Sequence, residues 1–226
     1  MKLFYKPLVW GGIFLVFIMF IGCHQLGLLP EQPMQDKVKE KVLFNGESLE
    51  GWKITDWTHG GEVDVEDGRL VLGQGHQGTG VTWKEEFPEM NYEVSLDAMR
   101  MKGSDFFCGM TFPVGKEFCT LVVGGWGGSL VGLSNIDGFD ASENTTTTHR
   151  QFENNQWYHI RLRVNEKRIE AWIDQEKVVD FSTKNHRLSL RMETLWSKPF
   201  GLLTWRTMGA FRNILVRYPL NNIENK

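Results

Sequence analysis

A polar run with the residue types of a catalytic or binding site occupies residues 135–144. It reads Asn-Ile-Asp-Gly-Phe-Asp-Ala-Ser-Glu-Asn, and His149 follows after four threonines. Carboxylates and imidazoles exchange protons with substrates, and carboxylates and amides hydrogen-bond sugar hydroxyls. The catalytic candidates are Asp137, Asp140 and His149, and the substrate-binding candidates in this run are Asn135 and Glu143. The alternative interpretation is a solvated connection between strands, although long loops often carry function.

The same run also raises the question of a metal. Carboxylates at residues 137, 140 and 143, with loop carbonyls, suit Ca²⁺, which takes roughly six to eight oxygen ligands. Their spacing differs from the Asp-x-Asp-x-Asp-Gly of an EF-hand loop. The six histidines are scattered, without the spacing of a zinc site. Ca²⁺ is therefore the one candidate cofactor, and no metal ligand is assigned.

A glycine-rich segment, residues 122–138, carries Trp126 between two pairs of glycines. It contains neither the Gly-x-x-x-x-Gly-Lys-Ser/Thr of a phosphate loop nor a complete Gly-x-Gly-x-x-Gly that opens a helix, which excludes a nucleotide cradle. Trp126 and Trp205 both stand at the ends of predicted strands, and we predict that they bind substrate together with Arg206. Alternation over residues 118–126 leaves a second interpretation open, in which Trp126 faces the core.

Paired carboxylates of the kind that glycosidases use are not evident in the sequence. The Glu-x-Asp-x-x-Glu strand motif of some sandwich glucanases is absent, and its nearest counterpart, Glu93-Val-Ser-Leu-Asp97, lacks the third acid. We interpret this segment as the outward face of a strand that pairs with Arg161 and Arg163 across a sheet.

Short strands with a period of two residues must position these side chains. Residues 91–99 and 157–164 alternate well, with one face apolar and the other polar, and residues 106–112 and 118–123 flank a hairpin signal at Pro113–Lys116. Further strands are predicted at 69–72, 81–83, 129–136, 169–173, 178–181, 200–205 and 211–218. No long amphipathic helix is evident, so the pattern predicts an all-β sandwich or barrel.

Three segments resemble known families. Residues 155–164, with the return at 169–174, resemble a meander of concanavalin A-like (laminin G-like) jelly rolls. The start, Leu43-Phe-Asn-Gly-Glu-Ser-Leu-Glu-Gly-Trp52, resembles the opening of the 3-keto-disaccharide hydrolase-type domain, and Ala210-Phe-Arg-Asn-Ile214 resembles that family's last strand. The resemblance implies a β-sandwich of two antiparallel sheets over residues 42–220. In place of the usual Glu-Trp-Asn, the meander opens with Asn155-Gln-Trp-Tyr158, and residues 106–143 depart from the family pattern.

The resemblance also implies an activity, namely cleavage of 3-keto-glucosides by hydrolase or lyase and hydratase steps. A ketone at C3 acidifies the proton at C2, so one base and one oxyanion stabiliser can eliminate the aglycone without paired glycosidase acids. The alternative is a lectin-like module that binds glycans without cleaving them, because such binders share this sandwich. Either protein has a carbohydrate as its partner.

The N-terminus resembles a bacterial lipoprotein signal. Lys2 and Lys6 precede an apolar stretch over residues 8–21, which is short for a membrane-spanning helix. The stretch ends in Phe20-Ile-Gly-Cys23, similar to a lipobox except for Phe20 in place of leucine. We predict a signal peptide over 1–22, a lipid on Cys23, a tether over 23–41, and a short tail over 221–226. An uncleaved N-terminal anchor is the alternative, and both place the domain in the cell envelope.

Composition bounds the remaining possibilities. The chain has 226 residues, 41% of them hydrophobic, and a formal net charge of -3 without a long basic run. Nucleic acid is therefore not an expected partner. Cys108 and Cys119 flank the predicted hairpin, which leaves open either a disulfide in an exported protein or two buried free thiols.

Overall fold

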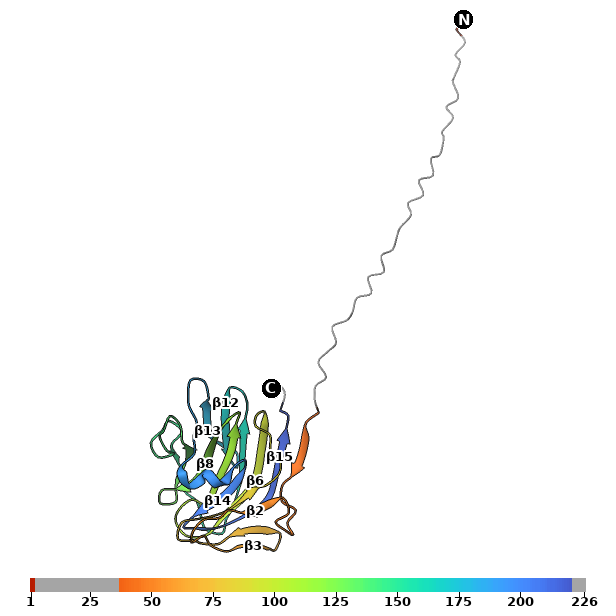
Figure 1. Ribbon diagram of the computed structural model, residues 1–226. Helices are drawn as coiled ribbons and strands as arrows, with labels where there is room; N and C mark the ends of the chain where they lie inside the picture. Colours follow the sequence, from red (N-terminus) through yellow and green to blue (C-terminus); the bar gives the residue numbers. More distant parts are fainter. Residues whose placement is uncertain (3–36, 221–226) are drawn as a thin grey trace. The chain divides into compact units, whose positions relative to one another are not determined.

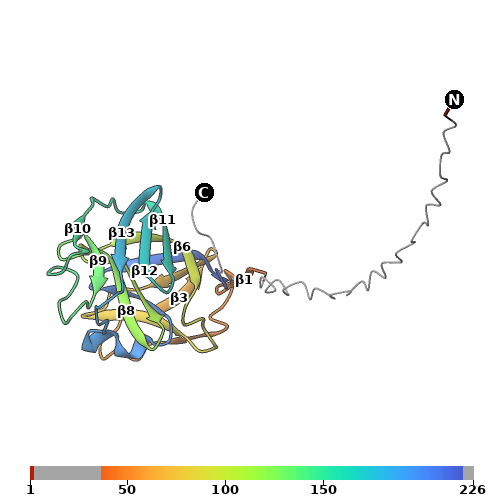
Figure 2. The ribbon, with the colours of Figure 1, turned by 90° about the horizontal axis from the view of Figure 1, so that it is seen from above.

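The computed structural model describes residues 1–2 and 37–220, and the chain divides into two units, residues 1–34 and 35–226. The described part of the second unit is built almost entirely from strands, which Figure 1 and Figure 2 show packed as two layers. The predicted signal peptide, Cys23 and most of the predicted tether lie outside the described residues. Within the described residues no helix is long and apolar enough to cross a membrane.

One layer is an eight-stranded sheet in the order β13-β12-β11-β6-β15-β4-β3, with β1 also paired to β15. Its strands are β1 (Lys39–Val42), β3 (Val63–Glu66), β4 (Arg69–Leu72), β6 (Tyr92–Lys102), β11 (Trp157–Val164), β12 (Arg168–Ile173), β13 (Glu176–Ser182) and β15 (Met208–Tyr218). Strand β1 begins inside the predicted tether, so the sandwich starts earlier than residue 42.

The second layer is a seven-stranded sheet in the order β10-β9-β8-β7-β14-β5-β2. Its strands are β2 (Trp52–Ile54), β5 (Gly78–Trp83), β7 (Cys108–Val114), β8 (Glu117–Gly125), β9 (Leu130–Ser134), β10 (Thr148–His149) and β14 (Gly201–Trp205). All pairings in both sheets are antiparallel. The predicted fold class, an all-β sandwich of two antiparallel sheets, is confirmed.

Alternation along the strands builds the core between the sheets. In β6 the side chains of Tyr92, Val94 and Leu96 are fully buried, and the inward residues Ile160 and Leu162 of β11 are buried beside them. Burial of a large apolar side chain contributes about 1.5–3 kcal/mol, which favours the pairing that turns these residues inward. These strands of the meander follow the predicted pattern.

The outer face of the eight-stranded sheet carries charges that pair across strands. Arg163 Nη2 lies 2.8 Å from Glu93 Oε2, and Arg161 Nη1 lies 3.6 Å from the same oxygen. Asp97 accepts hydrogen bonds from Asn213 and Arg212 and pairs with His159 at 2.8 Å. The predicted pairing of this face with Arg161 and Arg163 is confirmed, and these carboxylates belong to a cross-strand charge network.

The hairpin of β7 and β8 supplies two cysteines to the core. Both thiols are free and buried, and the register places Cys119 opposite Phe112, four residues along β7 from Cys108. That offset is roughly 13 Å along the strand, beyond the reach of a disulfide. Burial raises the pKa of both thiols, that of Cys119 to about 12, so both stay protonated and unreactive.

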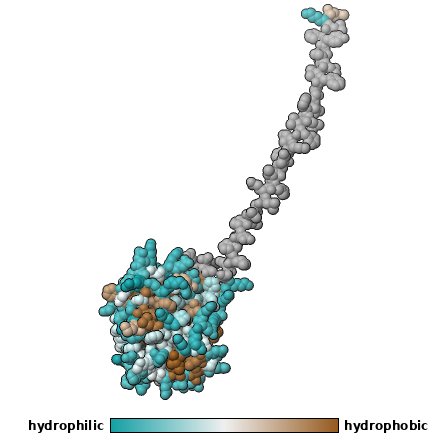
Figure 3. Space-filling model, viewed as in Figure 1, coloured by the Kyte–Doolittle hydropathy of each residue, from teal (hydrophilic) through white to brown (hydrophobic). Residues whose placement is uncertain are grey.

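One helical element accompanies the described strands. The 3₁₀ helix η1 (Met192–Ser197) lies next to β5, where the Thr82 hydroxyl donates to the Trp196 carbonyl at 3.1 Å. Gly201 of β14 lets the end of η1 lie close to the sheet, because a Cβ on this glycine would lie 2.7 Å from the Ser197 Cβ. The surface that faces the viewer in Figure 3 is largely hydrophilic with small apolar areas. Among the exposed apolar side chains are Met192 and Trp196 on η1.

Candidate active site

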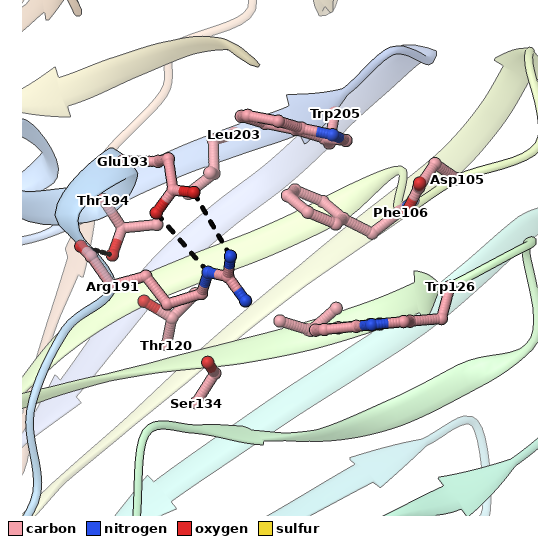
Figure 4. A pocket seen from close by; sticks show the side chains of 11 residues that line it. Asp105, Phe106, Thr120, Trp126, Ser134, Arg191, Glu193, Thr194, Leu203 and Trp205 are labelled. Atoms are coloured by element: carbon pink, nitrogen blue, oxygen red, sulfur yellow. Dashed lines mark hydrogen bonds and ion pairs between the residues drawn. The ribbon is translucent and has the colours of Figure 1, made fainter. Parts of the chain in front are cut away.

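A pocket of about 200 Å³ lies on the outer face of the seven-stranded sheet, beside η1 (Figure 4). Strands β8, β9 and β14, the segment before β7, the turn after β8 and the start of η1 all contribute to it. Its lining residues are Asp105, Phe106, Thr120, Val122, Trp126, Ser134, Arg191, Glu193, Thr194, Leu203 and Trp205. Aromatic rings and a few convergent polar groups are the usual lining of a small-molecule site.

The floor of the pocket comes from the outward-facing residues of the sheet. Along β8, Cys119, Leu121 and Val123 point into the core, so Thr120 and Val122 between them point outward into the pocket. Ser134 of β9 pairs with Thr120 across the strands, which brings two hydroxyl groups to the floor. Both faces of β8 are buried, one by the core and one by the pocket side chains.

Three aromatic side chains form the walls. The rings of Phe106 and Trp205 are stacked, with centroids 6.3 Å apart and planes inclined by 25°. Trp126 lies on the other side of Phe106 from Trp205 (Figure 4), and 43% of Trp126 is exposed. The interpretation that placed Trp126 in the core is therefore wrong, because the face it shares with Thr120 and Val122 is the pocket face.

The turn that presents Trp126 has an unusual backbone. Trp126 itself has φ of 45°, and Gly127 and Gly128 follow with φ of 88° and 101°. Glycine adopts this left-handed region without steric cost, whereas other residues do so rarely. A Cβ on Gly128 would lie 2.7 Å from Arg100 Nη1, so this glycine also makes room for a buried guanidinium.

That guanidinium, on Arg100 of β6, ties the turn to its surroundings. Arg100 is 8% exposed and donates to the Gly128 carbonyl at 3.1 Å, to Asn154 Oδ1 at 2.7 Å and to the Phe152 carbonyl. Since Gly128 follows Trp126 by two residues, the Arg100 side chain fixes the position of the Trp126 wall.

Charged groups close one end of the pocket. Arg191 Nη2 lies 3.2 Å from Glu193 Oε1, and Arg191 Nη1 lies 2.8 Å from Asp140 Oδ2. Figure 4 shows the guanidinium pointing toward the aromatic rings. The hydrogen bond from Arg191 lowers the pKa of Glu193, so Glu193 stays ionised and paired. The result is an oriented cation at the end of an aromatic-walled pocket.

Asp105 is the other acidic residue of the lining. Its Oδ1 accepts a hydrogen bond from the Phe106 backbone N–H at 2.8 Å, and its own N–H donates to Thr207 Oγ1 at 3.0 Å. Burial raises the pKa of Asp105, although the backbone N–H groups of Phe106 and Trp126 and the charge of Arg206 act in the opposite direction. A carboxyl group with a raised pKa in a pocket is a candidate for proton transfer.

Some of the residues predicted from sequence meet at this pocket. Trp126 and Trp205 both line it. Asp140 does not line it, but its carboxylate holds Arg191, which does. Arg206 is exposed beside the pocket, where its Nε donates to the His76 carbonyl at 3.2 Å and its charge acts on Asp105.

The structure places the other predicted residues elsewhere. Asp137 pairs with His186 at 2.6 Å, and the hydrogen bond from the Arg187 backbone lowers the pKa of Asp137. His149 is exposed on β10 beside Ser129, and Asn135 Oδ1 accepts from the Ser134 hydroxyl at 2.8 Å. Glu143 is exposed. Over the described ranges no three His, Cys, Asp or Glu side chains gather as a metal site would require.

Sequence reasoning missed three charged residues of the pocket, Asp105, Arg191 and Glu193. Each lies outside the regular strands, in a segment without periodic signal. The Arg-Met-Glu spacing of 191–193 becomes meaningful only in η1, where the turn brings both charges together. The signal available at Asp105 was its place directly before two aromatic residues at the start of a predicted strand.

The comparisons with known proteins identify a family and a fold. A family model described as a 3-keto-alpha-glucoside-1,2-lyase-like domain matches residues 39–217. No curated protein matches the chain.

Solved structures show the same fold at low identity. A Bacillus subtilis protein with a galectin-like fold has a TM-score of 0.56 at 11% identity and covers 79% of this chain and 94% of its own. The Crh5 transglycosylase has a TM-score of 0.55 at 9% identity, with 81% and 85% covered. A proposed glycosyl hydrolase of Parabacteroides distasonis has a TM-score of 0.51 at 15% identity, with 79% and 93% covered. At these identities the likeness shows the fold alone, a galectin-like sandwich.

Proposed function

Because this chain belongs to the 3-keto-alpha-glucoside-1,2-lyase-like family, a family of carbohydrate-active domains, we propose that it cleaves the glycosidic bond of 3-keto-glycosides in the pocket on the seven-stranded sheet. The observation that carries the proposal is the guanidinium of Arg191, which is oriented by Glu193 and Asp140 toward three aromatic rings. Such a site can hold a sugar ring and also stabilise negative charge on it.

The aromatic walls account for binding of the sugar. The apolar faces of a pyranose ring are matched by the flat surfaces of Trp126 and Trp205. At the floor the hydroxyls of Thr120 and Ser134 already bond to Thr111 and Asn135, and their oxygens keep a free lone pair that can accept from a sugar hydroxyl. Each tryptophan side chain has only two rotatable χ angles, so little side-chain conformational entropy is lost when the walls bind a ligand.

The guanidinium accounts for the chemistry. A ketone at C3 makes the C2 proton acidic, and loss of that proton places negative charge on the C3 oxygen. A fixed cation at this oxygen stabilises the charge as it develops. The C1–O bond to the aglycone then breaks by elimination, so paired glycosidase carboxylates are not required.

A second candidate function is glycan binding without cleavage. The observation that favours it is the exposed ring of Trp126 on the outer face of a sandwich, an arrangement that also suits a lectin-like binder. The two candidates differ in one respect, which is whether bound 3-keto sugar is consumed.

The direct experiment incubates the purified full chain with 3-keto-disaccharides and with their unoxidised parents, and follows both by proton NMR. We expect the 3-keto substrates to release the aglycone sugar while the parents bind without reaction. Thermal stabilisation by both sugars, with turnover of neither, would contradict the enzymatic function and support the lectin-like binder.

For location, we propose that the domain is exported and tethered by a lipid on Cys23 in the cell envelope. The support is the sequence signal over residues 1–23. Mass spectrometry of the mature N-terminus tests it: an acylated Cys23 is expected, and an intact Met1 on the membrane-associated protein would contradict it.

A further inference from the structure

We propose that Asp105 is the catalytic base of this pocket, which removes the proton next to the ketone of the substrate. The inference rests on the proposed function and assigns a role that the sequence motifs left unfilled. The pocket lining contains three charged side chains, Asp105, Arg191 and Glu193.

The geometry separates the two lining carboxylates by what they contact. Glu193 is committed to Arg191, which contacts both of its oxygens, at 3.2 and 3.4 Å. Asp105 lies on the other side of Phe106 from that ion pair (Figure 4). Because Asp105, Phe106 and Arg191 all line the pocket, a sugar ring bound beside Phe106 can meet the carboxylate and the guanidinium from different directions, as proton removal and charge stabilisation require.

The surroundings of Asp105 suit proton transfer. Its Oδ1 is oriented by the Phe106 N–H, so the carboxylate has a fixed direction. Burial raises its pKa, which makes the carboxylate a stronger base than an exposed aspartate, and the charged group that acts on it is Arg206. Efficient general bases have a pKa moved toward the working pH in this way.

The step balances without any further reagent. The Asp105 carboxylate takes the proton from C2, and the electrons of the C2–H bond delocalise onto the C3 oxygen beside Arg191. When the C3 carbonyl re-forms, a C1–C2 double bond forms and the C1–O bond breaks. The aglycone oxygen leaves with the electron pair and takes the proton from Asp105, directly or relayed through a water molecule, so the carboxylate is regenerated.

The substitution Asp105→Asn tests this role without removing the hydrogen-bond acceptor for Phe106. We expect kcat for a 3-keto-disaccharide to fall by about 10²–10⁴-fold, while the Kd of the unoxidised parent stays within about twofold. Asp64→Asn is the matched control, since Asp64 is an exposed carboxylate on β3 of the other sheet.

Two further readouts separate catalysis from positioning. In D₂O the wild-type protein should incorporate deuterium at C2 of the remaining substrate, and Asp105→Asn should not.

The kcat/KM of the wild type should fall at acidic pH as the carboxylate is protonated. The residual activity of Asp105→Asn should not show this decrease at acidic pH.

The possible outcomes are distinct. Near-normal turnover and exchange in Asp105→Asn, with active wild type, would overturn the base assignment and leave the proposed function standing. A raised Kd with unchanged kcat would make Asp105 a positioning residue only. Absence of turnover in the wild type would remove the proposed function, and the base assignment with it.

Discussion

Replacing Arg191 by methionine is expected to lower kcat for 3-keto-glycosides by about 10²–10³-fold, the usual loss when a preorganised oxyanion donor is removed. Methionine keeps much of the length and apolar stem of the side chain but removes the charge that Glu193 and Asp140 orient. The stabilised charge is absent from the bound ground-state substrate and develops only as the C2 proton is removed, so the change should appear in kcat more than in KM.

Two variants make this result specific. Arg191→Lys keeps a positive charge but not the planar fork that binds two carboxylates, and it should recover part of the lost rate. Arg187→Met is the matched control, because Arg187 is exposed in the same segment and lies outside the pocket lining. Full activity in Arg191→Met would show that this guanidinium stabilises no reacting charge.

Replacing Arg100 by methionine is expected to lower the free energy of unfolding by at least about 2 kcal/mol. The guanidinium serves the buried carbonyls of Gly128 and Phe152 and the side-chain oxygen of the exposed Asn154. Each of the two buried acceptors that loses its donor costs about 1–3 kcal/mol. Denaturant unfolding measures the difference. Arg217→Met is the control, since Arg217 forms an exposed ion pair with Glu40 that should contribute less than about 1 kcal/mol.

The same variant should also weaken sugar binding, because Arg100 holds the turn that carries Trp126. At a temperature where Arg100→Met remains folded, we expect faster amide hydrogen exchange at residues 126–128 and a raised Kd for the parent disaccharide. If the variant loses stability but keeps the wild-type Kd and exchange at this turn, then Arg100 supports the sandwich and not the binding wall.

Much of the fold was predictable because its strands follow a simple period. In β6 and β11 one face packs in the core and the other carries charges that meet across the sheet, so each residue type reports its face. The 42–220 boundary missed β1, since Lys39–Val42 is a mostly exposed edge strand without alternation. The helix η1 was missed because six residues are too few to show a helical period.

The pocket was harder to predict because it buries the second face of β8. Thr120 and Val122 carry no charge and resemble core residues in type, so alternation alone cannot tell which face of β8 lies in the core. The polar composition of residues 135–144 predicted a site there. Of its charged residues, only Asp140 contacts a residue of the pocket lining, namely Arg191. Contacts such as Asp140 with Arg191 join residues 51 positions apart, which no local pattern records.

The most direct test of this account is the position of a bound sugar. A crystal structure of the full chain with the unoxidised parent of a turned-over disaccharide should place one sugar ring against Trp126 and Trp205, with its C3 oxygen directed at Arg191. A sugar bound instead on the 135–149 loop beside Asp137 and His149, with the pocket empty, would contradict the account and show that the binding site lies on that loop.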